Sequence, residues 1–296
     1  MKIDLHIHSK DCSDGMKTLR EIFEEASKRE IGLISITDHD SLDCQEPAEA
    51  LAMHWGMQYL YGLELNVSFT HPEYRNGKPI SLDFLAYQYD IHYQPLVQKL
   101  QDLRQYRKVR AQRILEKIND ELAKEKIELL KEEDMKAIES TVEGTFGRPH
   151  LANYLVKKKI VANKQEAFDK YLVRCDVPKM PLSLAEASAL VRGAGGKLML
   201  AHPNDPSGTS LVSFTTSLEE QQEIIKETML PYIDGVECWR SKHDQITLNS
   251  YLAFAKKNGL MVTGGSDCHQ QPVIIGSVDV PPYVAAQFGL VPKRQL

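Results

Sequence analysis

The chain has 296 residues, 42% of them hydrophobic and 26% charged, which is enough for one large α/β domain or one domain with an insertion. Its formal net charge of −5 excludes the global basic excess that drives non-specific nucleic-acid binding. Five cysteines without a CxxC pair indicate a reducing compartment and argue against a disulfide framework. Because no apolar run approaches membrane length, we expect a cytoplasmic protein without membrane contact.

The first predicted strand carries two histidines. Apolar and polar side chains alternate from Ile3 to His8, which is the period of a strand and places His6 and His8 on one face. Histidines two apart at a strand end can bind one metal ion because their nitrogens converge. An amphipathic strand with a solvated polar face is the alternative interpretation.

The next elements also lead to polar side chains. We predict helices over residues 19–26, ended by Gly32, and 46–55, and strands over residues 33–37, 59–63 and about 80–87. Asp38 and His39 follow the first of these strands, Glu64 follows the second, and Asp83 lies in the third. The βαβαβ order predicts a parallel sheet or barrel with its reactive groups at the carboxyl edge.

Residues 93–181 interrupt this order. They are rich in Lys, Glu, Arg and Leu and have helical periodicity, with an apolar stripe made by Leu96, Leu100, Leu103, Ile114, Leu115 and Ile118. We therefore predict a first part of the α/β domain at residues 1–92, an inserted helical subdomain at 93–181 and a second part at 182–296. We expect the insertion to act as a lid over the active edge.

Strands and helices alternate again after residue 182. Ser183 with Glu186, and Ser217 with Glu220, are capping boxes that predict two helix starts. Further strands are predicted at residues 197–200, 235–239 and 260–263, a helix at 245–257, and weak strand character at 277–280. The strand at 197–200 leads to His202, and the strand at 260–263 leads to Asp267 and His269.

Ten imidazole or carboxylate side chains are expected near one edge of the sheet: His6, His8, Asp14, Asp38, His39, Glu64, Asp83, His202, Asp267 and His269. A donor set of this kind, without thiolates, suits Zn²⁺, Mn²⁺ or Fe²⁺ better than Ca²⁺. The number of donors predicts two or three divalent ions. Clustered ions of this type are used for phosphoester hydrolysis.

Five short motifs resemble those of the PHP family, named for polymerase and histidinol phosphatase. They are His6-x-His8, Thr37-Asp38-His39, Gly62-x-Glu64, Ala201-His202-Pro203 and Ser266-Asp267-x-His269. The motifs follow the family's order over nearly the whole chain. The resemblance implies an α/β fold, a distorted (β/α)7 barrel of the PHP type, which holds up to three metal ions.

The resemblance also implies a ligand set for each ion. One ion would be bound by His6, His8, Glu64 and Asp267; a second by Glu64, Asp83 and His202; and a third by Asp14, His39 and His269. Asp83 and Asp14 depart from the family pattern, because many members have a histidine there, and we expect a change in metal preference. Asp38 and Asp40 would orient the imidazoles.

Residues 147–152 resemble a segment in the branch of PHP phosphoesterases that act on small nucleotides. Arg148 would bind a substrate phosphate through its planar fork, and His150 would protonate the leaving alkoxide. His243 is a second candidate acid, and Lys179 is a further candidate for phosphate contact. The alternative is a surface helix with Pro149 in its first turn.

The sequence thus predicts a metal-dependent phosphoesterase acting through a metal-bridged hydroxide. As the resemblance implies, the substrate would be a small phosphate monoester such as AMP or a 3′,5′-bisphosphate nucleotide, with no stable nucleic-acid complex. One alternative is a 5′→3′ exoribonuclease on short RNA, whose strand would be contacted by Arg104, Arg107, Lys108, Arg110 and Arg113. Histidinol phosphatase and a metal-binding module without turnover are the others.

Overall fold

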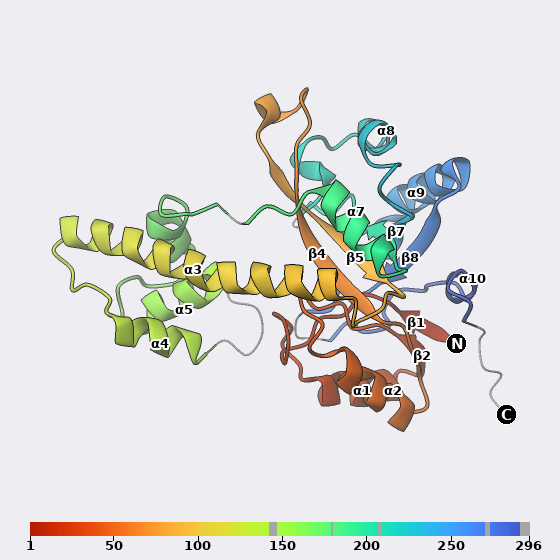
Figure 1. The fold of residues 1–296 in the computed structure, drawn as a ribbon, viewed down its shortest axis with the longest axis horizontal. Coiled ribbons are helices and arrows are strands. Elements are labelled where there is room, and N and C mark those ends of the chain that lie inside the picture. The colour runs from red at the N-terminus through yellow and green to blue at the C-terminus, as the bar shows by residue number, and fades with distance from the viewer. Residues whose placement is uncertain (142–146, 179, 207–208, 270–272, 291–296) are drawn as a thin grey trace. The chain divides into compact units, whose positions relative to one another are not determined.

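The structure is a computed structural model that describes residues 1–141, 147–178, 180–206, 209–269 and 273–290 (Figure 1). It divides into two compact units. Residues 1–97 and 181–296 form the strand-containing unit, and residues 98–180 form the helical unit. Lys179 lies outside the described residues. None of the described helices is long and apolar enough to span a membrane.

The strand-containing unit has two sheets. The first contains β1 (Lys2–Asp4), β2 (Ile31–Ile34) and β3 (Gln58–Tyr59), all parallel. The second has the order β4 (Gly62–Phe69), β5 (Ile80–Tyr87), β6 (Lys197–Leu200), β7 (Gly235–Arg240) and β8 (Met261–Gly265). β6, β7 and β8 are parallel, whereas β5 is antiparallel to both of its neighbours.

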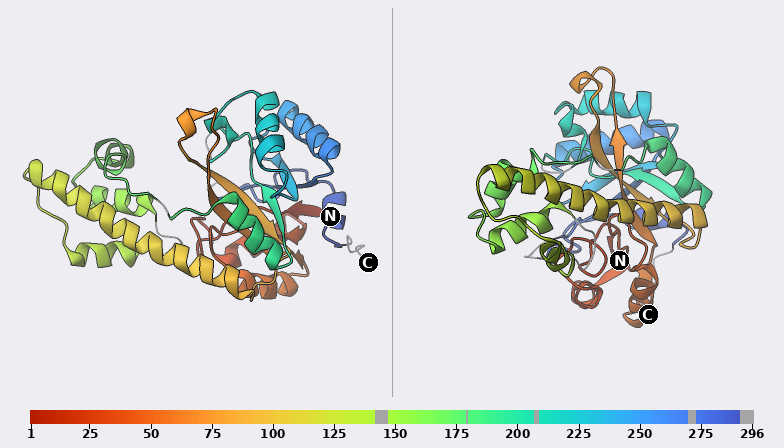
Figure 2. Two further views of the ribbon diagram at one scale, coloured as in Figure 1. Left: turned by 45° about the horizontal axis from the view of Figure 1, so that its top comes forward. Right: turned by 60° about the vertical axis from the view of Figure 1, so that its left-hand side comes forward.

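The direction of β5 corrects the prediction of a parallel arrangement throughout. Only residues 70–79, which include the short helix η1 (Arg75–Gly77), join β4 to β5. This connection is too short for the crossover that parallel strands need, so the two strands form a hairpin. The hairpin projects beyond the other strands (Figures 1 and 2). Asp83 lies within β5 as predicted, whereas Glu64 lies within β4 and not after a strand.

Backbone hydrogen bonds link the two sheets at both margins. Beside β8, Leu5 N–H donates to the Gly264 carbonyl (3.2 Å) and Asp267 N–H donates to the His6 carbonyl (2.8 Å). Beside β4, Asp40 N–H donates to the Glu64 carbonyl (2.9 Å). The first strand therefore lies next to the last one, and β1 is shorter than predicted because the chain beyond Asp4 bonds outside a regular ladder.

The carboxylate of Asp4 strengthens the contact between β1 and β8. One oxygen, Oδ1, accepts from the backbone N–H of Ser266 (2.9 Å), and Oδ2 accepts from Gly276 N–H (2.7 Å). Asp4 is 1% exposed. A buried carboxylate needs such donors, and here they come from the opposite end of the chain.

Helices flank the strands of this unit. They are α1 (Leu19–Lys28), α2 (Gln45–His54), α7 (Leu184–Gly193), α8 (Leu218–Thr228), α9 (Gln245–Asn258) and α10 (Tyr283–Ala286), with the short η3 (Leu211–Ser213). The hydroxyls of Ser183 and Ser217 cap α7 and α8 as predicted. α1 ends before the predicted Gly32 because Glu30 has a φ of 61°, and no described strand covers residues 277–280.

Cys12 and Cys44 form a disulfide, which corrects the expectation of unpaired cysteines. Cys12 lies in the loop after β1, and Cys44 immediately precedes α2. Their Cα atoms are 6.0 Å apart because β1 and β2 pair in parallel and their following loops emerge side by side. Five cysteines without a CxxC pair can still form a single disulfide between distant positions. Cys175, Cys238 and Cys268 are buried and take no part in a disulfide.

The helical unit contains most of α3 (Gln94–Lys124), then α4 (Glu132–Glu139), α5 (Arg148–Lys157), α6 (Lys164–Ala167) and η2 (Phe168–Leu172). Ile114 and Ile118 of the predicted apolar stripe share a core with Leu151 and Leu155 of α5. This unit therefore has its own hydrophobic core. A role as a lid stays a prediction.

Candidate metal centre

His6 and His8 follow β1 and are buried, at 0% and 1% exposure. Ile7 between them packs into the core with α1 and α2, so both imidazoles point to the other side of the chain. Their Nε2 atoms lie 3.1 Å apart. The interpretation as a solvated polar face is therefore wrong.

Glu64 of β4 lies at the centre of the cluster. Its Oε1 atom is 3.1 Å from His202 Nε2 and 3.4 Å from His6 Nε2. Its Oε2 atom is 3.0 Å from His8 Nε2 and 3.2 Å from His39 Nδ1. One carboxylate thus faces four imidazoles from three segments, which is the arrangement expected of a group shared between neighbouring ions.

Two further carboxylates belong to the cluster: Asp267 follows β8, and Asp14 lies in the loop after β1. Asp267 Oδ1 lies 3.3 Å from His6 Nε2, 3.4 Å from His8 Nε2 and 3.1 Å from His269 Nδ1. Asp14 Oδ1 lies 3.2 Å from His269 Nε2. The Asp14 side chain is 51% exposed, so this side of the cluster is open to solvent.

Asp83 enters the cluster from β5. Its Oδ2 atom lies 3.9 Å from His202 Nε2 and accepts a hydrogen bond from the Thr209 hydroxyl. Burial raises the pKa of the Asp83 carboxyl, and the negative charge of the nearby Glu64 raises it further.

The donor set fits divalent metal ions. All nine predicted ligands belong to groups whose donor atoms lie within 4.8 Å of one another: His8, Asp14, His39 and His269; His6, His8 and Asp267; His6, Glu64 and His202; and His39, Glu64 and Asp83. Glu64 Oε2 and Asp267 Oδ1 are buried and make no hydrogen bond among the described residues, although imidazole nitrogens lie 3.0 Å and 3.1 Å away. Such atoms are costly unless a cation compensates them.

The imidazoles and carboxylates perturb each other's protonation. Burial alone lowers the pKa of His6, but the carboxylates of Asp267, Glu237 and Glu64 outweigh it and hold this pKa well above its usual value. Burial alone raises the pKa of Asp267, but the surrounding imidazoles hold it well below its usual value. Divalent cations can replace the histidine protons that balance these carboxylates.

Residues 4–175, more than half of the chain, match the sequence profile of the PHP domain. The chain belongs to the PHP family. The predicted family and enzyme class, a phosphoesterase, are thereby confirmed, together with an α/β fold of the PHP type.

The sequence of this PHP protein is similar to those of several enzymes. It is 26% identical over 285 residues to the 3′,5′-nucleoside bisphosphate phosphatase of Chromobacterium violaceum, covering 90% of this chain and 87% of the relative. It is also 26% identical over 289 residues to the 5′-3′ exoribonuclease Rnm of Escherichia coli, covering 90% and 85%.

Solved structures share the fold. A protein from Bifidobacterium adolescentis, named as a metal-dependent phosphoesterase, superposes with a TM-score of 0.74 at 25% identity, covering 96% of this chain and 94% of that one. An amidohydrolase from Chromobacterium violaceum gives a TM-score of 0.73 at 24% identity, covering 96% and 93%.

Sequence analysis of this PHP protein missed three buried charged residues near the cluster. Glu237 in β7 is 3.0 Å from His6 Nδ1. Arg240 at the end of β7 contacts Asp267 and lies 2.7 Å from Asp205, which is fully buried. A glutamate in the middle of an apolar strand was the available signal, because a buried carboxylate needs a partner. No comparable pattern singles out Asp205.

Asp38 and Asp40 were predicted to orient imidazoles. Both Asp38 oxygens instead accept from Ser9, one from its backbone N–H (2.6 Å) and one from its hydroxyl (2.6 Å). Burial raises the pKa of Asp38 to about 6. Asp38 therefore holds the segment that carries His8, and Asp40 accepts from the backbone N–H of Asn66 (3.4 Å).

His243 of this PHP protein follows β7. Its Nδ1 lies 2.9 Å from the Cys238 carbonyl, which can only accept, so Nδ1 carries the hydrogen. Its Nε2 is buried without a hydrogen-bonding partner among the described residues. Burial lowers the pKa of His243, so the resting side chain is neutral and Nε2 is an acceptor.

Arg148 and His150 lie at the start of α5 in the helical unit. Arg148 Nη1 is 3.1 Å from Asp176 Oδ2, and its guanidinium lies over the Phe168 ring. The Gly147 N–H donates to His150 Nδ1 (3.2 Å). Because these residues belong to the other unit, their roles toward a substrate stay predictions.

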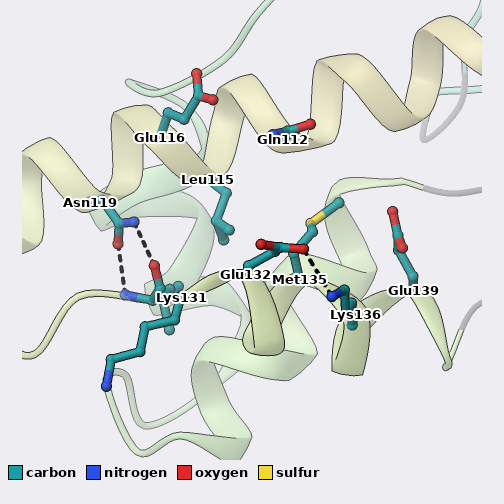
Figure 3. Close-up of a pocket in the computed structure, with 10 residues that line it drawn as sticks. Gln112, Leu115, Glu116, Asn119, Lys131, Glu132, Met135, Lys136 and Glu139 are labelled. Atoms are coloured by element: carbon teal, nitrogen blue, oxygen red, sulfur yellow. Dashed lines mark hydrogen bonds and ion pairs between the residues drawn. The ribbon is translucent and has the colours of Figure 1, made fainter.

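A pocket within the helical unit contains none of the predicted site residues. It lies between α3 and α4 and is lined by polar and apolar side chains (Figure 3). Lys136 pairs with Glu132 (2.8 Å), and Asn119 makes two hydrogen bonds with the backbone of Leu130. The pocket is therefore part of the helix packing.

Proposed function

We propose that this PHP protein hydrolyses small phosphate monoesters, above all nucleotides such as AMP or a 3′,5′-bisphosphate nucleotide. The observation that carries this proposal is the position of Glu64, whose two oxygens each face two imidazoles. A carboxylate so placed can serve two adjacent ions. The bisphosphate phosphatase among the relatives supports a nucleotide substrate.

Two or three divalent ions, Mn²⁺, Fe²⁺ or Zn²⁺, suit this centre. His6, His8, Glu64 and Asp267 would hold the first ion; Glu64, Asp83 and His202 the second; and Asp14, His39 and His269 the third. When bound, the ions would supply a water of lowered pKa and neutralise charge on the phosphate.

The remaining roles belong to side chains that contact the substrate. The guanidinium fork of Arg148 matches two phosphate oxygens, and Lys179 adds a point charge. The proton needed by the leaving alcohol would come from His150 or from Nε2 of His243 after that nitrogen has been protonated. The helical unit would limit access to small molecules or chain ends.

We also infer that the two sheets together form a distorted (β/α)7 barrel with an inserted helical subdomain. The support comes from the backbone hydrogen bonds at both margins, between Leu5 and Gly264 and between Asp40 and Glu64. Such a barrel would bring the ligand-bearing segments into a ring around Glu64.

A 5′→3′ exoribonuclease acting on short RNA is the second candidate. It is favoured by the similarity to the Escherichia coli exoribonuclease and by exposed cations on α3, Arg104, Lys108 and Arg113. Arg110 does not belong to this set, since it is buried and pairs with Asp176 and the Val177 carbonyl.

The test is phosphate release from nucleotides, sugar phosphates, histidinol phosphate and short oligonucleotides, with Mn²⁺ and again after chelation. We expect release from mononucleotides that chelation abolishes. Faster hydrolysis of a trinucleotide would favour the exoribonuclease, and no release with any metal would favour a binding module.

Substitution of one ligand sharpens this test. His8→Ala should abolish turnover while the fold is kept, and His54→Ala, which removes an exposed imidazole from α2, is the matched control. Near-normal turnover by His8→Ala would contradict the proposal.

A further inference from the structure

Glu237 is buried at 0% exposure in the middle of β7, where its neighbours are apolar. It is not among the nine predicted ligands. Its Oε1 lies 3.0 Å from His6 Nδ1, and its Oε2 accepts the backbone N–H of His202 at 2.8 Å. Both oxygens of one carboxylate are therefore engaged with two ligand-bearing segments.

The contact with His6 fixes which ring nitrogen carries the hydrogen. An ionised carboxylate can only accept, so the shared hydrogen belongs to Nδ1 of His6. The opposite nitrogen, Nε2, then presents its lone pair to the cluster, where Glu64 and Asp267 lie within 3.4 Å. A hydrogen-bonded carboxylate behind a ligating imidazole fixes its orientation and raises its basicity.

The contact with His202 fixes a strained backbone. His202 has a φ of 26°, which a residue with a side chain rarely adopts. The hydrogen bond from its N–H to Glu237 holds this conformation, in which His202 Nε2 lies 3.1 Å from Glu64 Oε1. Such strained residues persist only where the surroundings determine them.

We infer that Glu237 is a positioning residue that sets the metal-binding nitrogen of His6 and the backbone of His202 at the same time. It thereby couples ligands from the segments after β1 and β6, which are proposed to bind different ions. This inference rests on the metal dependence in the proposed function.

Glu237→Gln is the decisive variant because it keeps the size and shape of the side chain. An amide has one acceptor and one donor, whereas Glu237 provides two acceptors. In one orientation the amide N–H meets Nδ1 of His6 and forces the hydrogen onto Nε2. In the other orientation it meets the N–H of His202.

The matched control is Thr263→Val. Thr263 is the residue opposite Glu237 in the β7–β8 ladder, is fully buried and makes no hydrogen bond through its hydroxyl among the described residues. This change alters polarity at the same depth in the sheet without removing a hydrogen bond to His6 or His202.

The experiment is titration of the metal-free chain with Co²⁺, followed by the absorption bands of the bound ion and by the number of ions bound. We expect Glu237→Gln to bind about 10–100-fold more weakly with altered bands, and Thr263→Val to match the wild type. Unchanged affinity and bands in a folded Glu237→Gln would overturn the inference.

A shorter side chain keeps the inference testable if Glu237→Gln does not fold. Glu237→Asp retains the charge but is too short to reach both partners, so the same weakening is expected, and wild-type binding by it would contradict the inference. If the wild type binds no ion, the proposed function fails together with the inference. If the wild type binds ions and a folded Glu237 variant binds them equally well, only the inference fails.

Discussion

The side chain of Asn66 donates a 2.6 Å hydrogen bond to Asp83 Oδ1 from the position directly opposite it in the β4–β5 ladder. The Thr209 hydroxyl donates to the other Asp83 oxygen. This carboxylate is therefore held in place where many PHP family members have an imidazole. Because β4 also carries Glu64, the hairpin sets the distance between two acidic groups of the cluster.

Replacing Asp83 by Ala should reduce the number of tightly bound ions by one, since the second proposed ion would keep only Glu64 and His202. Metal content after dialysis against Mn²⁺ is the measurement. Ser81→Ala, two residues earlier in β5, is the control and should bind like the wild type. An unchanged metal content in Asp83→Ala would remove Asp83 from the ligand set.

Arg148→Ala should raise KM for a nucleotide about 10–100-fold with a small effect on kcat, because hydrogen bonds to charged groups contribute about 1.5–3 kcal/mol. Arg174→Ala in the same unit is the control, since Arg174 is 58% exposed. A lowered unfolding temperature with unchanged KM would show that Arg148 serves only to pair with Asp176.

The ion pair between Asp134 and Lys158 should make the stability of the helical unit sensitive to acid. Burial alone raises its pKa, but the Lys158 ammonium at 2.6 Å and the Lys131 N–H outweigh burial and lower this pKa to about 2. A carboxyl with a lowered folded-state pKa stabilises above its unfolded pKa of about 3.9 and loses that effect as the pH falls toward 2.

Asp134→Asn should therefore lower the unfolding temperature at pH 6, and its difference from the wild type should shrink between about pH 4 and pH 2. Thermal unfolding followed by circular dichroism measures both chains. Glu133→Gln, at an exposed neighbouring position, should leave the difference near zero throughout. A difference independent of pH would contradict the assigned ion pair.

The Cys12–Cys44 disulfide closes a loop with a sequence separation of 32 residues. Loop closure of this length predicts about 3–4 kcal/mol of stability from the restricted unfolded chain. The Cys12→Ser, Cys44→Ser double variant should lose this amount in urea unfolding. Thiol titration of the unfolded, unreduced wild type should give three thiols, and five thiols would contradict the bond.

The periodicity of the sequence predicted most helices and strands because capping residues and apolar alternation are local signals. The strand Ile80–Tyr87 and the caps at Ser183 and Ser217 are examples. The antiparallel direction of β5 could not be inferred from that strand alone, since it depends on pairing with β4 and β6. The antiparallel direction is instead explained by the connection at residues 70–79, which is too short for a parallel crossover.

The clustering of most predicted ligands could be expected because they belong to a short motif or, like Asp83, to a strand with an unexpected polar residue. The contacts of Glu237 and Arg240 could not be predicted from the sequence, because they depend on which strand lies beside β1 and β8. The Cys12–Cys44 bond was missed for a similar reason: its two cysteines meet only through the parallel pairing of β1 and β2.

The contact between β1 and β8 restricts when the metal centre can form during synthesis of the chain. His6 and His8 are synthesised before the other proposed ligands, and Asp267, His269 and the backbone that binds Asp4 come at least 258 residues later. At about 5–20 residues per second, the ribosome needs roughly 10–50 seconds for that distance. The proposed first and third ion sites therefore cannot be complete before residues 267 and 269 have been synthesised, whereas the ligands of the second site, Glu64, Asp83 and His202, are available earlier.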